Sequence, residues 1–500
     1  MSKISMWKAS TSETNFPKLQ TSLSVDVVII GGGITGITAA YNLSKAGKRV
    51  AVLEALKIGE GDTGSSTGNL YCTIGDPGLH SIESKFSANK AKEVAESRAD
   101  AVRFIEDRTL EYDIDCDFKK VPWNLFTEGN ESSDYIEKEK EAAQKAGVIT
   151  NSNICFPLPV TGFMVPNQAQ FNPLKYVKAL AENIHSDHCM IFENSRAVKI
   201  QEGETCTVET EEGSITAQYI IMATHTPLGI YFVQSSLAAY REYAVAVKLN
   251  SEYPAPGIFW DMIENEHYSM RVYDSPKGKV LMVLGEMHKT GQKDYNEECF
   301  DNLEKFLRDR FDVASVEYKW SAQQFKAADG IPYIGLSSGN NKTYIATGFS
   351  ADGLTYGTLA AMIIADEILG NDNPWAKTYD ASRLTPIASA SNFIKENLNV
   401  AAELIKDTLK KAEVKNFTDI QPGEGKIVEI EGQKCAASRT QEGELFAVSA
   451  ICTHMGCTVH WNQAEASWDC PCHGSRFTQK GEVIEGPAIA PLKNINTKDD

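Results

Sequence analysis

The chain has 500 residues and a net charge of −18, and 42% of its residues are hydrophobic while 23% are charged. This length exceeds what one hydrophobic core supports, so two or three globular domains of ordinary composition are expected. The acidic balance argues against nucleic acid or an anionic membrane surface as a partner, and without a signal peptide or an apolar run of roughly 20 residues the protein is expected to be cytoplasmic.

The first predicted elements form a dinucleotide-binding unit. Residues 26–30 (DVVII) have the unbroken apolar pattern of a buried parallel strand, and they lead into the turn Gly31–Gly36 and a helix to Ala46. A second strand over 49–53 ends on Glu54. Glycines let the backbone approach a pyrophosphate at the helix N-terminus, and the acid can hold a ribose hydroxyl. This pattern leaves NAD and FAD both open, and its predicted binding residues are Gly31, Gly33, Ile34, Thr35, Gly36 and Glu54.

Four later segments favour FAD through a resemblance. They are residues 61–69 (GDTGSSTGN), Ala197-Val198, 219–224 (YIIMAT) and 329–355, which contains Gly348-Phe-Ser-Ala-Asp-Gly353-Leu-Thr355. With these segments, most of residues 1–385 resembles the glycine oxidase and D-amino acid oxidase family of FAD enzymes. The resemblance implies the further cofactor-binding residues Thr63, Gly64, Ser65, Ser66, Gly68, Asn69, Val198, Ala223, Thr224, Gly330, Gly348, Ser350, Gly353, Leu354 and Thr355.

The same resemblance implies the architecture of residues 1–387. An α/β domain of the Rossmann type would bind FAD, and an antiparallel β domain would cover the substrate. A helix from Gly353 to about Leu369 would point its N-terminus, and so its positive dipole end, at the flavin pyrimidine ring. The FAD-binding segments are about 24–75, 195–230 and 325–370, and the covering segments are about 76–194 and 231–324. Charge and alternation patterns add helices over 133–146 and 172–184 and strands over 240–249, 268–272 and 280–284.

Candidate substrate residues come from the covering domain. Arg271 lies near the position where the family has an arginine that clamps a substrate carboxylate, and a structural salt bridge is its alternative role. Arg241 is a similar candidate, with the structural role favoured. Tyr268 would hydrogen-bond the substrate or pack in the core. His225 is interpreted as a structural histidine rather than a catalytic base.

Residues 388–413 are predicted to be a linker helix. Ile394, Leu398, Ala401, Ile405 and Leu409 fall on one helical stripe, which is expected to dock on the flavin domain. The opposite face mixes acidic and basic residues, so a membrane-binding helix is disfavoured.

Two short loops near the end of the chain each offer one cysteine and one histidine at close spacing. They are Cys452-Thr-His454-Met-Gly-Cys457 and Cys470-Pro-Cys472-His473-Gly-Ser475. Two thiolates and two imidazoles suit a tetrahedral zinc ion, and they also suit a Rieske [2Fe–2S] cluster, in which two histidines replace two cysteines on one iron. Zinc is disfavoured because its known spacings lack an additional cysteine in each loop.

The two loops closely resemble the Rieske signature, C-x-H-x-G-C followed by C-P-C-H-G-S. The resemblance implies that the cluster ligands are Cys452, His454, Cys470 and His473, and that Cys457 and Cys472 form a disulfide between the loops. Residues 486–492 resemble the third loop that shields such a cluster. An all-β Rieske domain over 414–500 is therefore expected. The chain stops nine residues after Pro491, which would let a second copy supply the closing strand in a homo-oligomer.

The two expected cofactors together indicate a direction of electron flow. A flavin takes two electrons from an organic substrate, whereas the cluster accepts one. This combination favours a dehydrogenase of the C–N bond of an amine or amino acid that passes electrons singly to the cluster and on to an external partner. Two alternatives remain: a reductase fed by a donor such as NADH, for which no second dinucleotide fold is found, and an electron-transfer or redox-sensing protein without small-molecule turnover.

Overall fold

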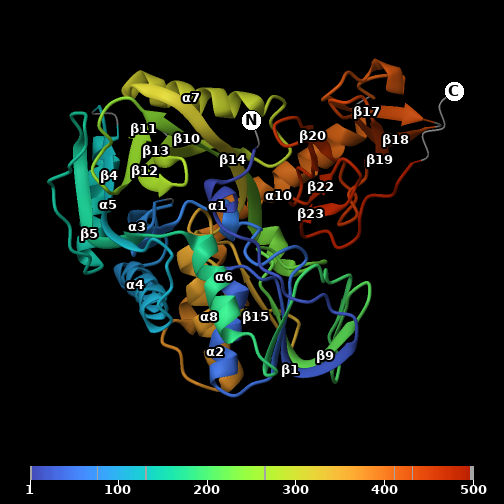
Figure 1. Ribbon diagram of the computed structural model, residues 1–500, viewed down its shortest axis with the longest axis horizontal. Helices are drawn as coiled ribbons and strands as arrows, with labels where there is room; N and C mark the ends of the chain where they lie inside the picture. The colour runs from blue at the N-terminus through green and yellow to red at the C-terminus, as the bar shows by residue number, and fades with distance from the viewer. Residues whose placement is uncertain are drawn as a thin grey trace.

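The computed structural model describes residues 3–75, 77–129, 132–263, 266–383, 385–409, 412–430 and 432–495. Figure 1 shows a large part built on two eight-stranded sheets, with a smaller β-rich part from the end of the chain packed beside it. The expected fold class, a Rossmann-type α/β domain with a covering β domain and a C-terminal all-β domain, is confirmed.

The first sheet places β1 between β9 and β2, with the order β15-β16-β9-β1-β2-β6. Pairing is parallel on both sides of β1, with Ile29 opposite Val52 of β2 and Ile221 of β9. The predicted strand–turn–helix–strand unit is confirmed. Helices α2 and α8 bury one face of its strands, and residues of β8, β9 and the second sheet bury the other. The bounds are β1 Ser22–Ile30, α2 Ile34–Lys45, β2 Val50–Leu53, β6 Cys189–Phe192, β7 Lys199–Gln201, β8 Cys206–Glu209, β9 Ser214–Met222, β15 Tyr333–Leu336, β16 Thr343–Thr347 and α8 Gly353–Leu369.

The second sheet has the order β14-β10-β13-β12-β11-β4-β5-β3 and covers the carboxyl ends of the first. The alternating segments expected over 240–249, 268–272 and 280–284 are strands β10, β12 and β13, each longer than predicted. Helix α7 packs on its outer face through Phe300, Leu303 and Leu307. The bounds are β3 Asn69–Leu70, β4 Lys119–Thr127, β5 Thr161–Gln170, β10 Leu237–Leu249, β11 Ile258–Ile263, β12 Glu266–Ser275, β13 Gly278–Lys289, α7 Glu297–Arg310 and β14 Val313–Ala327.

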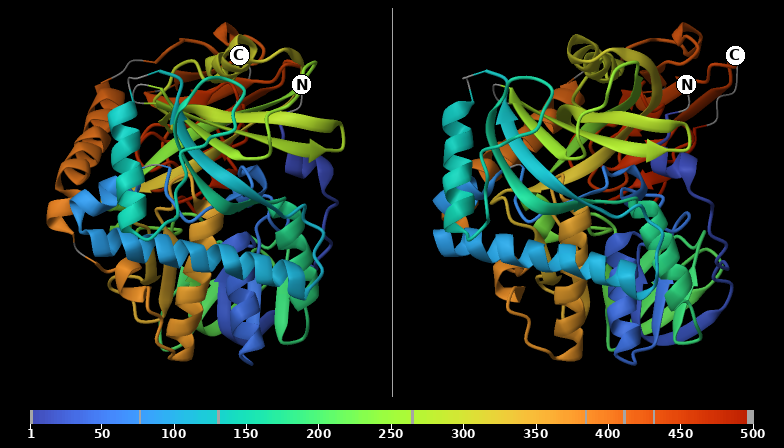
Figure 2. Two further views of the ribbon diagram at one scale, coloured as in Figure 1. Left: turned by 90° about the vertical axis from the view of Figure 1, so that its left-hand side faces the viewer. Right: turned by 60° about the vertical axis from the view of Figure 1, so that its left-hand side comes forward.

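Helices complete the large part. The predicted helices over 133–146 and 172–184 are α5 (Ser133–Lys145) and α6 (Pro173–Ile184). Helix α4 (Ala88–Glu111), the long helix that crosses the lower half of both views in Figure 2, was not predicted from the sequence. Shorter helices are α1 (Met6–Ser10), α3 (Leu79–Lys85) and α9 (Ala376–Tyr379).

The linker helix α10 (Pro386–Leu409) is present, but the prediction that its apolar stripe docks on the flavin domain is wrong. Ile394 and Leu398 are 56% and 64% exposed, and Ala401 is exposed as well. The side chains of Ile405 and Leu409 lie outside the described part of the chain. Contact is made instead by polar side chains outside the stripe: Asn392 donates to the Ala328 carbonyl, Asn397 donates to the Ser235 carbonyl, and Glu396 pairs with Lys289.

The C-terminal part has two small antiparallel sheets. One contains β17 (Gly425–Ile430), β18 (Gln433–Arg439) and β19 (Leu445–Ser449), and the other contains β20 (His460–Asn462), β21 (Ser467–Asp469), β22 (Arg476–Thr478) and β23 (Val483–Glu485). Cysteine loops 452–457 and 470–475 flank the second sheet, and its core includes Trp468 and Phe477. Across the described residues, we find no helix with the length and apolar composition needed to cross a membrane.

Candidate active site and iron–sulfur centre

The turn after β1 packs so closely on neighbouring backbone that side chains do not fit at two of its glycines. A Cβ atom on Gly31, whose φ is +108°, would collide with the carbonyl oxygen of Ala223, and one on Gly36 would collide with that of Gly31. Glu54 accepts hydrogen bonds from the backbone N–H groups of Gly32 (2.7 Å) and Leu56 (2.8 Å), and burial raises the pKa of its carboxyl group. The N–H groups of Gly31 and Ile34 are bonded to the Leu53 carbonyl and the Thr63 hydroxyl, so the positive end of the α2 dipole, beside a fixed acid, is the main feature that favours a phosphate here.

A cavity of about 270 Å³ lies against this turn. Its walls come from the ends of β1, β2 and β9, from the loop before β3, from the N-terminus of α8 and from strands of the second sheet. The predicted cofactor residues that line it are Gly31, Gly33, Ile34, Thr35, Glu54, Thr63, Ser65, Ser66, Asn69, Ala223, Thr224, Ser350, Gly353 and Leu354. Those outside the lining are Gly36, Gly64, Gly68, Val198, Gly330, Gly348 and Thr355, and Ala197 takes the place expected for Val198.

A buried ion pair that sequence reasoning missed fixes the N-terminus of α8 at the cavity wall. Arg98 of α4 lies with Nη1 3.2 Å from Oδ2 of Asp352, and its Nη2 donates to the Tyr71 carbonyl at 3.0 Å. The Tyr71 hydroxyl also donates to Asp352. Because Arg98 neutralises Asp352, the positive end of the α8 dipole remains available to the cavity. A single arginine within a long helix carries no sequence signal for such a role.

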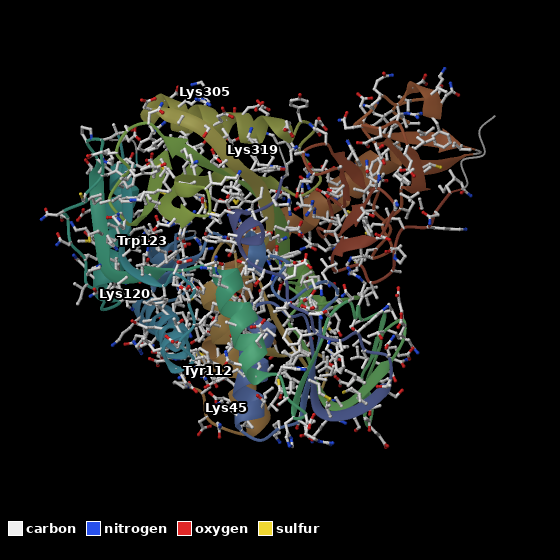
Figure 3. All side chains as sticks on the ribbon, in the orientation of Figure 1. Lys45, Tyr112, Lys120, Trp123, Lys305 and Lys319 are labelled. Carbon is white, nitrogen blue, oxygen red and sulfur yellow. A yellow bond between two sulfur atoms is a disulfide. The ribbon has the colours of Figure 1, made fainter. Side chains whose placement is uncertain are left out.

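Aromatic residues close the far end of this region. The Tyr71 ring lies 5.9 Å from that of Trp123 and 6.3 Å from that of Trp260, measured between centroids. Trp123, labelled in Figure 3, comes from β4 and Trp260 from the neighbouring β11. Both tryptophans are buried, and of the three rings only Tyr71 lines the cavity, so an aromatic cluster supports Tyr71 from behind.

The three predicted substrate residues are not brought together. Arg271 and Tyr268 point to opposite faces of β12, because their positions on the strand differ by three, an odd number. Arg271 is fully buried on the inner face, and its Nε and Nη1 atoms have no hydrogen-bond partner among the described residues. Tyr268 packs outward on Phe306 of α7 and donates to Glu286. Arg241 forms an ion pair with Glu465 of the C-terminal part, so a structural role accounts for its position.

Three residues of the cavity wall were not predicted as site residues. Glu242 and Asp62 were not singled out from the sequence, and His225 was interpreted as structural. Glu242 lines the wall, accepts a hydrogen bond from Gln324 (2.9 Å) and lies 3.6 Å from Nε2 of His267. His225 lies with Nδ1 2.8 Å from Oδ2 of Asp62, and both line the cavity. Only folding could reveal them, since they come from strands and loops far apart in the chain.

The four predicted cluster ligands converge in the C-terminal part. The His454 and His473 rings are 5.0 Å apart and nearly perpendicular, at 83°, and their Nδ1 atoms are buried without a partner in the described residues. Cys457 and Cys472 form the expected disulfide, and their sulfur atoms lie within 4.8 Å of that of Cys470. Two free thiols, two open imidazole nitrogens and a neighbouring disulfide fit a Rieske cluster.

The tautomer of His454 supports this assignment. Its Nε2 lies 3.2 Å from the Gly229 carbonyl oxygen and 3.2 Å from Oε1 of Gln234. The Gln234 amide is fixed by donation from its Nε2 to the Pro227 and Gly229 carbonyls at 2.8 Å each. Since both groups facing Nε2 are acceptors, Nε2 carries the proton and the Nδ1 lone pair is free for a metal.

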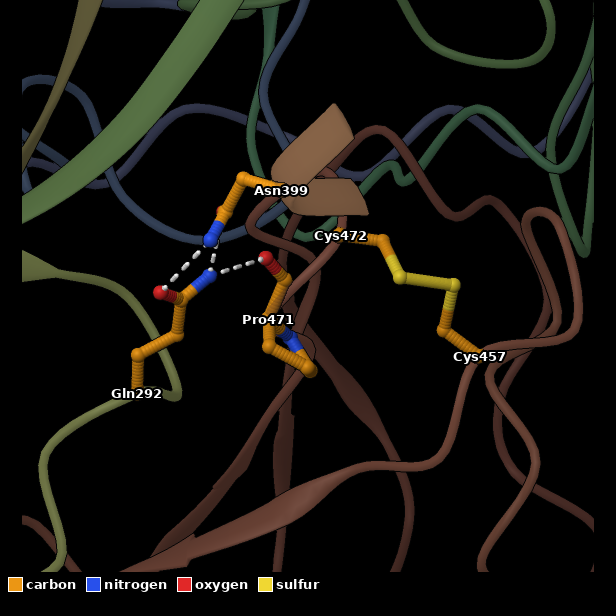
Figure 4. Close-up of a disulfide and its surroundings, with 5 residues drawn as sticks. All are labelled: Gln292, Asn399, Cys457, Pro471 and Cys472. Atoms are coloured by element: carbon orange, nitrogen blue, oxygen red, sulfur yellow. Dashed lines mark hydrogen bonds between the residues drawn. A yellow bond between two sulfur atoms is a disulfide. The ribbon is translucent and has the colours of Figure 1, made fainter. Parts of the chain in front are cut away.

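The C-terminal part also completes the cavity. Residues 484–486, 488 and 489 line it, and Gln323, a cavity residue of β14, donates to the carbonyl of Gly474 at 2.8 Å. On the other side of the second cysteine loop, Gln292 donates to Pro471 and bonds Asn399 of α10, close to the disulfide (Figure 4). The cavity and the four-ligand centre therefore adjoin across a packed interface.

This fold and these two sites define a flavin oxidoreductase with a Rieske domain. The family model of FAD dependent oxidoreductases (DAO) matches residues 26–367, and that of the Rieske [2Fe-2S] domain matches residues 410–496. The chain belongs to the DAO family of FAD dependent oxidoreductases and carries a Rieske domain, so its cofactors are FAD and a [2Fe–2S] cluster rather than zinc.

Individual proteins show the same combination or one part of it. The chain is 36% identical to the Rieske 2Fe-2S iron-sulfur protein YhfW of Bacillus subtilis (strain 168), over 98% of this chain and 97% of that one. It is 25% identical to gamma-glutamylputrescine oxidoreductase of Escherichia coli (strain K12), over 73% and 88%. Among solved structures, glycine oxidase from Geobacillus kaustophilus shares the fold with a TM-score of 0.58 and 17% identity, covering 72% of this chain and 99% of that one.

Proposed function

We propose that this protein dehydrogenates a C–N bond of an amine or amino acid and passes the electrons singly from FAD to the cluster and on to an external acceptor. The observation that carries the proposal is the shared boundary of the two cofactor sites. Residues 484–489 of the Rieske domain form part of the wall of the flavin cavity, and Gln323 links that cavity to the loop that holds His473.

In each site, the cofactor would supply the redox chemistry and the protein residues would hold the cofactor. Bound FAD supplies hydride acceptance, and the cluster supplies one-electron transfer. The Gly31–Gly36 turn would hold the pyrophosphate at the N-terminus of α2, and Glu54 would hold the ribose. The N-terminus of α8 would stabilise negative charge on the flavin. Cys452, His454, Cys470 and His473 would hold the two irons.

The proposed substrate class rests on two polar residues of the second sheet and on the relatives: Arg271 is buried outside the cavity lining, and Glu242 lines the cavity. Arg271 has two guanidinium nitrogens without a partner among the described residues, which suits a substrate carboxylate. Glu242 lines the cavity, and among the described residues its Oε1 has no hydrogen bond and only His267 nearby, at 3.6 Å, so it would accept a hydrogen bond from a substrate amine. Gamma-glutamylputrescine oxidoreductase and glycine oxidase are named for amine and amino-acid chemistry, which agrees with this reading.

An anaerobic turnover screen tests the proposal. Purified protein that contains flavin and iron would be mixed with a panel of amines and amino acids, and flavin bleaching followed by cluster reduction would be recorded by absorbance and by electron paramagnetic resonance. We expect at least one amine or amino acid to bleach the flavin and then reduce the cluster. Bleaching by NADH alone would indicate the reductase, and bleaching by no compound would indicate a carrier or sensor.

A further inference from the structure

The Rieske domain contributes an acid to the flavin cavity. Glu485, the last residue of β23, lines the cavity together with His225 and Asp62 of the FAD domain. Its Oε1 lies 3.3 Å from Nη1 of Arg476 and 3.7 Å from Nη1 of Arg241. Its Oε2 has no hydrogen-bond partner among the described residues, although the atom is buried. One carboxyl oxygen is therefore held by arginines while the other is unused.

Glu485 is connected to both the flavin cavity and the cluster site. It directly precedes Gly486-Pro487, in the loop whose Pro487 carbonyl accepts a hydrogen bond from the Gly229 N–H, and the Gly229 carbonyl faces His454. An ionisable group thus lies at the cavity wall on the side from which electrons would leave. The Glu485 carboxyl group is not needed as a cluster ligand, because thiolates and imidazoles already supply the four ligands.

We propose that Glu485 accepts the proton that leaves the flavin when its electrons pass to the cluster. This inference rests on the proposed electron flow. Hydride transfer from the substrate gives the flavin two electrons and one proton at N5, so reoxidation must release two electrons and that proton. The cluster takes the electrons one at a time and hands each to an external one-electron carrier. The C–N substrate leaves as an iminium ion, and the proton from N5 passes to the Glu485 carboxylate.

The charges around Glu485 act on its pKa in both directions. Burial raises the pKa of Glu485 above its ordinary value, and Asp62 adds to this effect, while Arg476, Arg241 and His225 oppose it. His225 forms an ion pair with Asp62, whose charge raises the pKa of the imidazole against the effect of burial. Lys8 of α1 and Glu465 of the β20–β21 turn complete the charged surroundings.

The test uses Glu485→Gln in the full-length holoprotein, with Glu482→Gln on the exposed surface three residues earlier as the matched control. Flash photoreduction of the flavin makes the experiment independent of any substrate, and cluster absorbance is followed over pH. Cluster signals in electron paramagnetic resonance verify that each variant is intact. A proton acceptor must be ionised, so the wild-type and control rates should rise with pH along a limb set by Glu485.

We expect Glu485→Gln to slow cluster reduction at least tenfold at the top of this limb and to remove the limb together with the solvent isotope effect. His225→Gln should move the limb to higher pH, because the lost cation and the unpaired Asp62 both favour protonated Glu485. A variant that is slower with an unchanged limb would show undocking instead of lost proton acceptance and would overturn the inference. Wild-type rates in Glu485→Gln would overturn it too. Failure of the amine screen alone would affect only the proposed function.

Discussion

Docking of the Rieske domain on the flavin domain depends on a buried ion pair, and replacing Arg241 with methionine should disrupt it. Arg241 Nη2 lies 2.6 Å from Oε1 of Glu465, and Arg476 lies 3.0 Å from the same carboxylate. Burial alone would raise the pKa of Glu465, but the two arginines lower it to about 2 from an ordinary 4.5. At about 1.4 kcal/mol for each pH unit, this preference for the ionised form corresponds to about 3 kcal/mol.

Mutations of buried ion pairs in other proteins give a similar free-energy cost. Removing one partner of a buried ion pair costs about 3–5 kcal/mol, because the other charge stays buried without compensation. At about 1.4 kcal/mol per factor of ten, the docked-to-undocked ratio should fall by roughly two to three orders of magnitude. Hydrogen exchange at residues 229–236 and 484–489 would report the undocking, and flash photoreduction would report slower cluster reduction with an intact flavin.

Two further variants make this test decisive. Leu398→Asp on the exposed stripe of α10 should leave docking unchanged, since that side chain is 64% exposed. Combining Arg241→Met with Glu465→Leu should recover part of the docking, because the second change removes the unpaired carboxylate. Wild-type exchange and cluster reduction in Arg241→Met would refute the view that this ion pair holds the two domains together.

Four other outcomes are expected. The purified protein should contain flavin and two irons per chain, and Cys452→Ser should lose the iron while retaining flavin, as measured by metal and flavin analysis. Phe477→Tyr should raise the cluster potential within the range of roughly −150 to +300 mV, because Ser475 matches a hydroxyl donor of high-potential relatives and Phe477 stands where they have a tyrosine donor; voltammetry showing no rise would contradict this. Arg271→Leu should raise the KM for a carboxylate-bearing substrate about 10–100-fold, the loss of a charged hydrogen bond of about 1.5–3 kcal/mol, without a loss of thermal stability. Acidification from pH 4.5 toward 2 should weaken docking progressively, because the contribution of Glu465 is present above its ordinary pKa and is lost as the pH falls through the lowered one.

The sequence by itself determined the features that depend on local pattern. An apolar strand, a turn in which only glycine fits and an acid 23 residues after Gly31 are contiguous or closely spaced, so the nucleotide site could be read directly from residues 26–54. The same holds for the cluster, whose ligands occupy two short loops. Even the helical period of α10 was recognised, because a period of 3.6 residues is a property of the segment alone.

Only the tertiary structure decided which face of an element meets which neighbour. The apolar stripe of α10 was expected inside, yet polar side chains outside the stripe contact Lys289, Ser235 and Ala328, since buried hydrogen bonds depend on partners that a single segment cannot specify. Arg98 reaches Asp352 across 254 positions and Arg241 reaches Glu465 across 224, and nothing in the local sequence records such pairs. Glu242 and Glu485, which were missed, and His225, which was interpreted as structural, come from three distant strands or loops, and the Rieske domain brings Glu485 to the wall of their shared cavity.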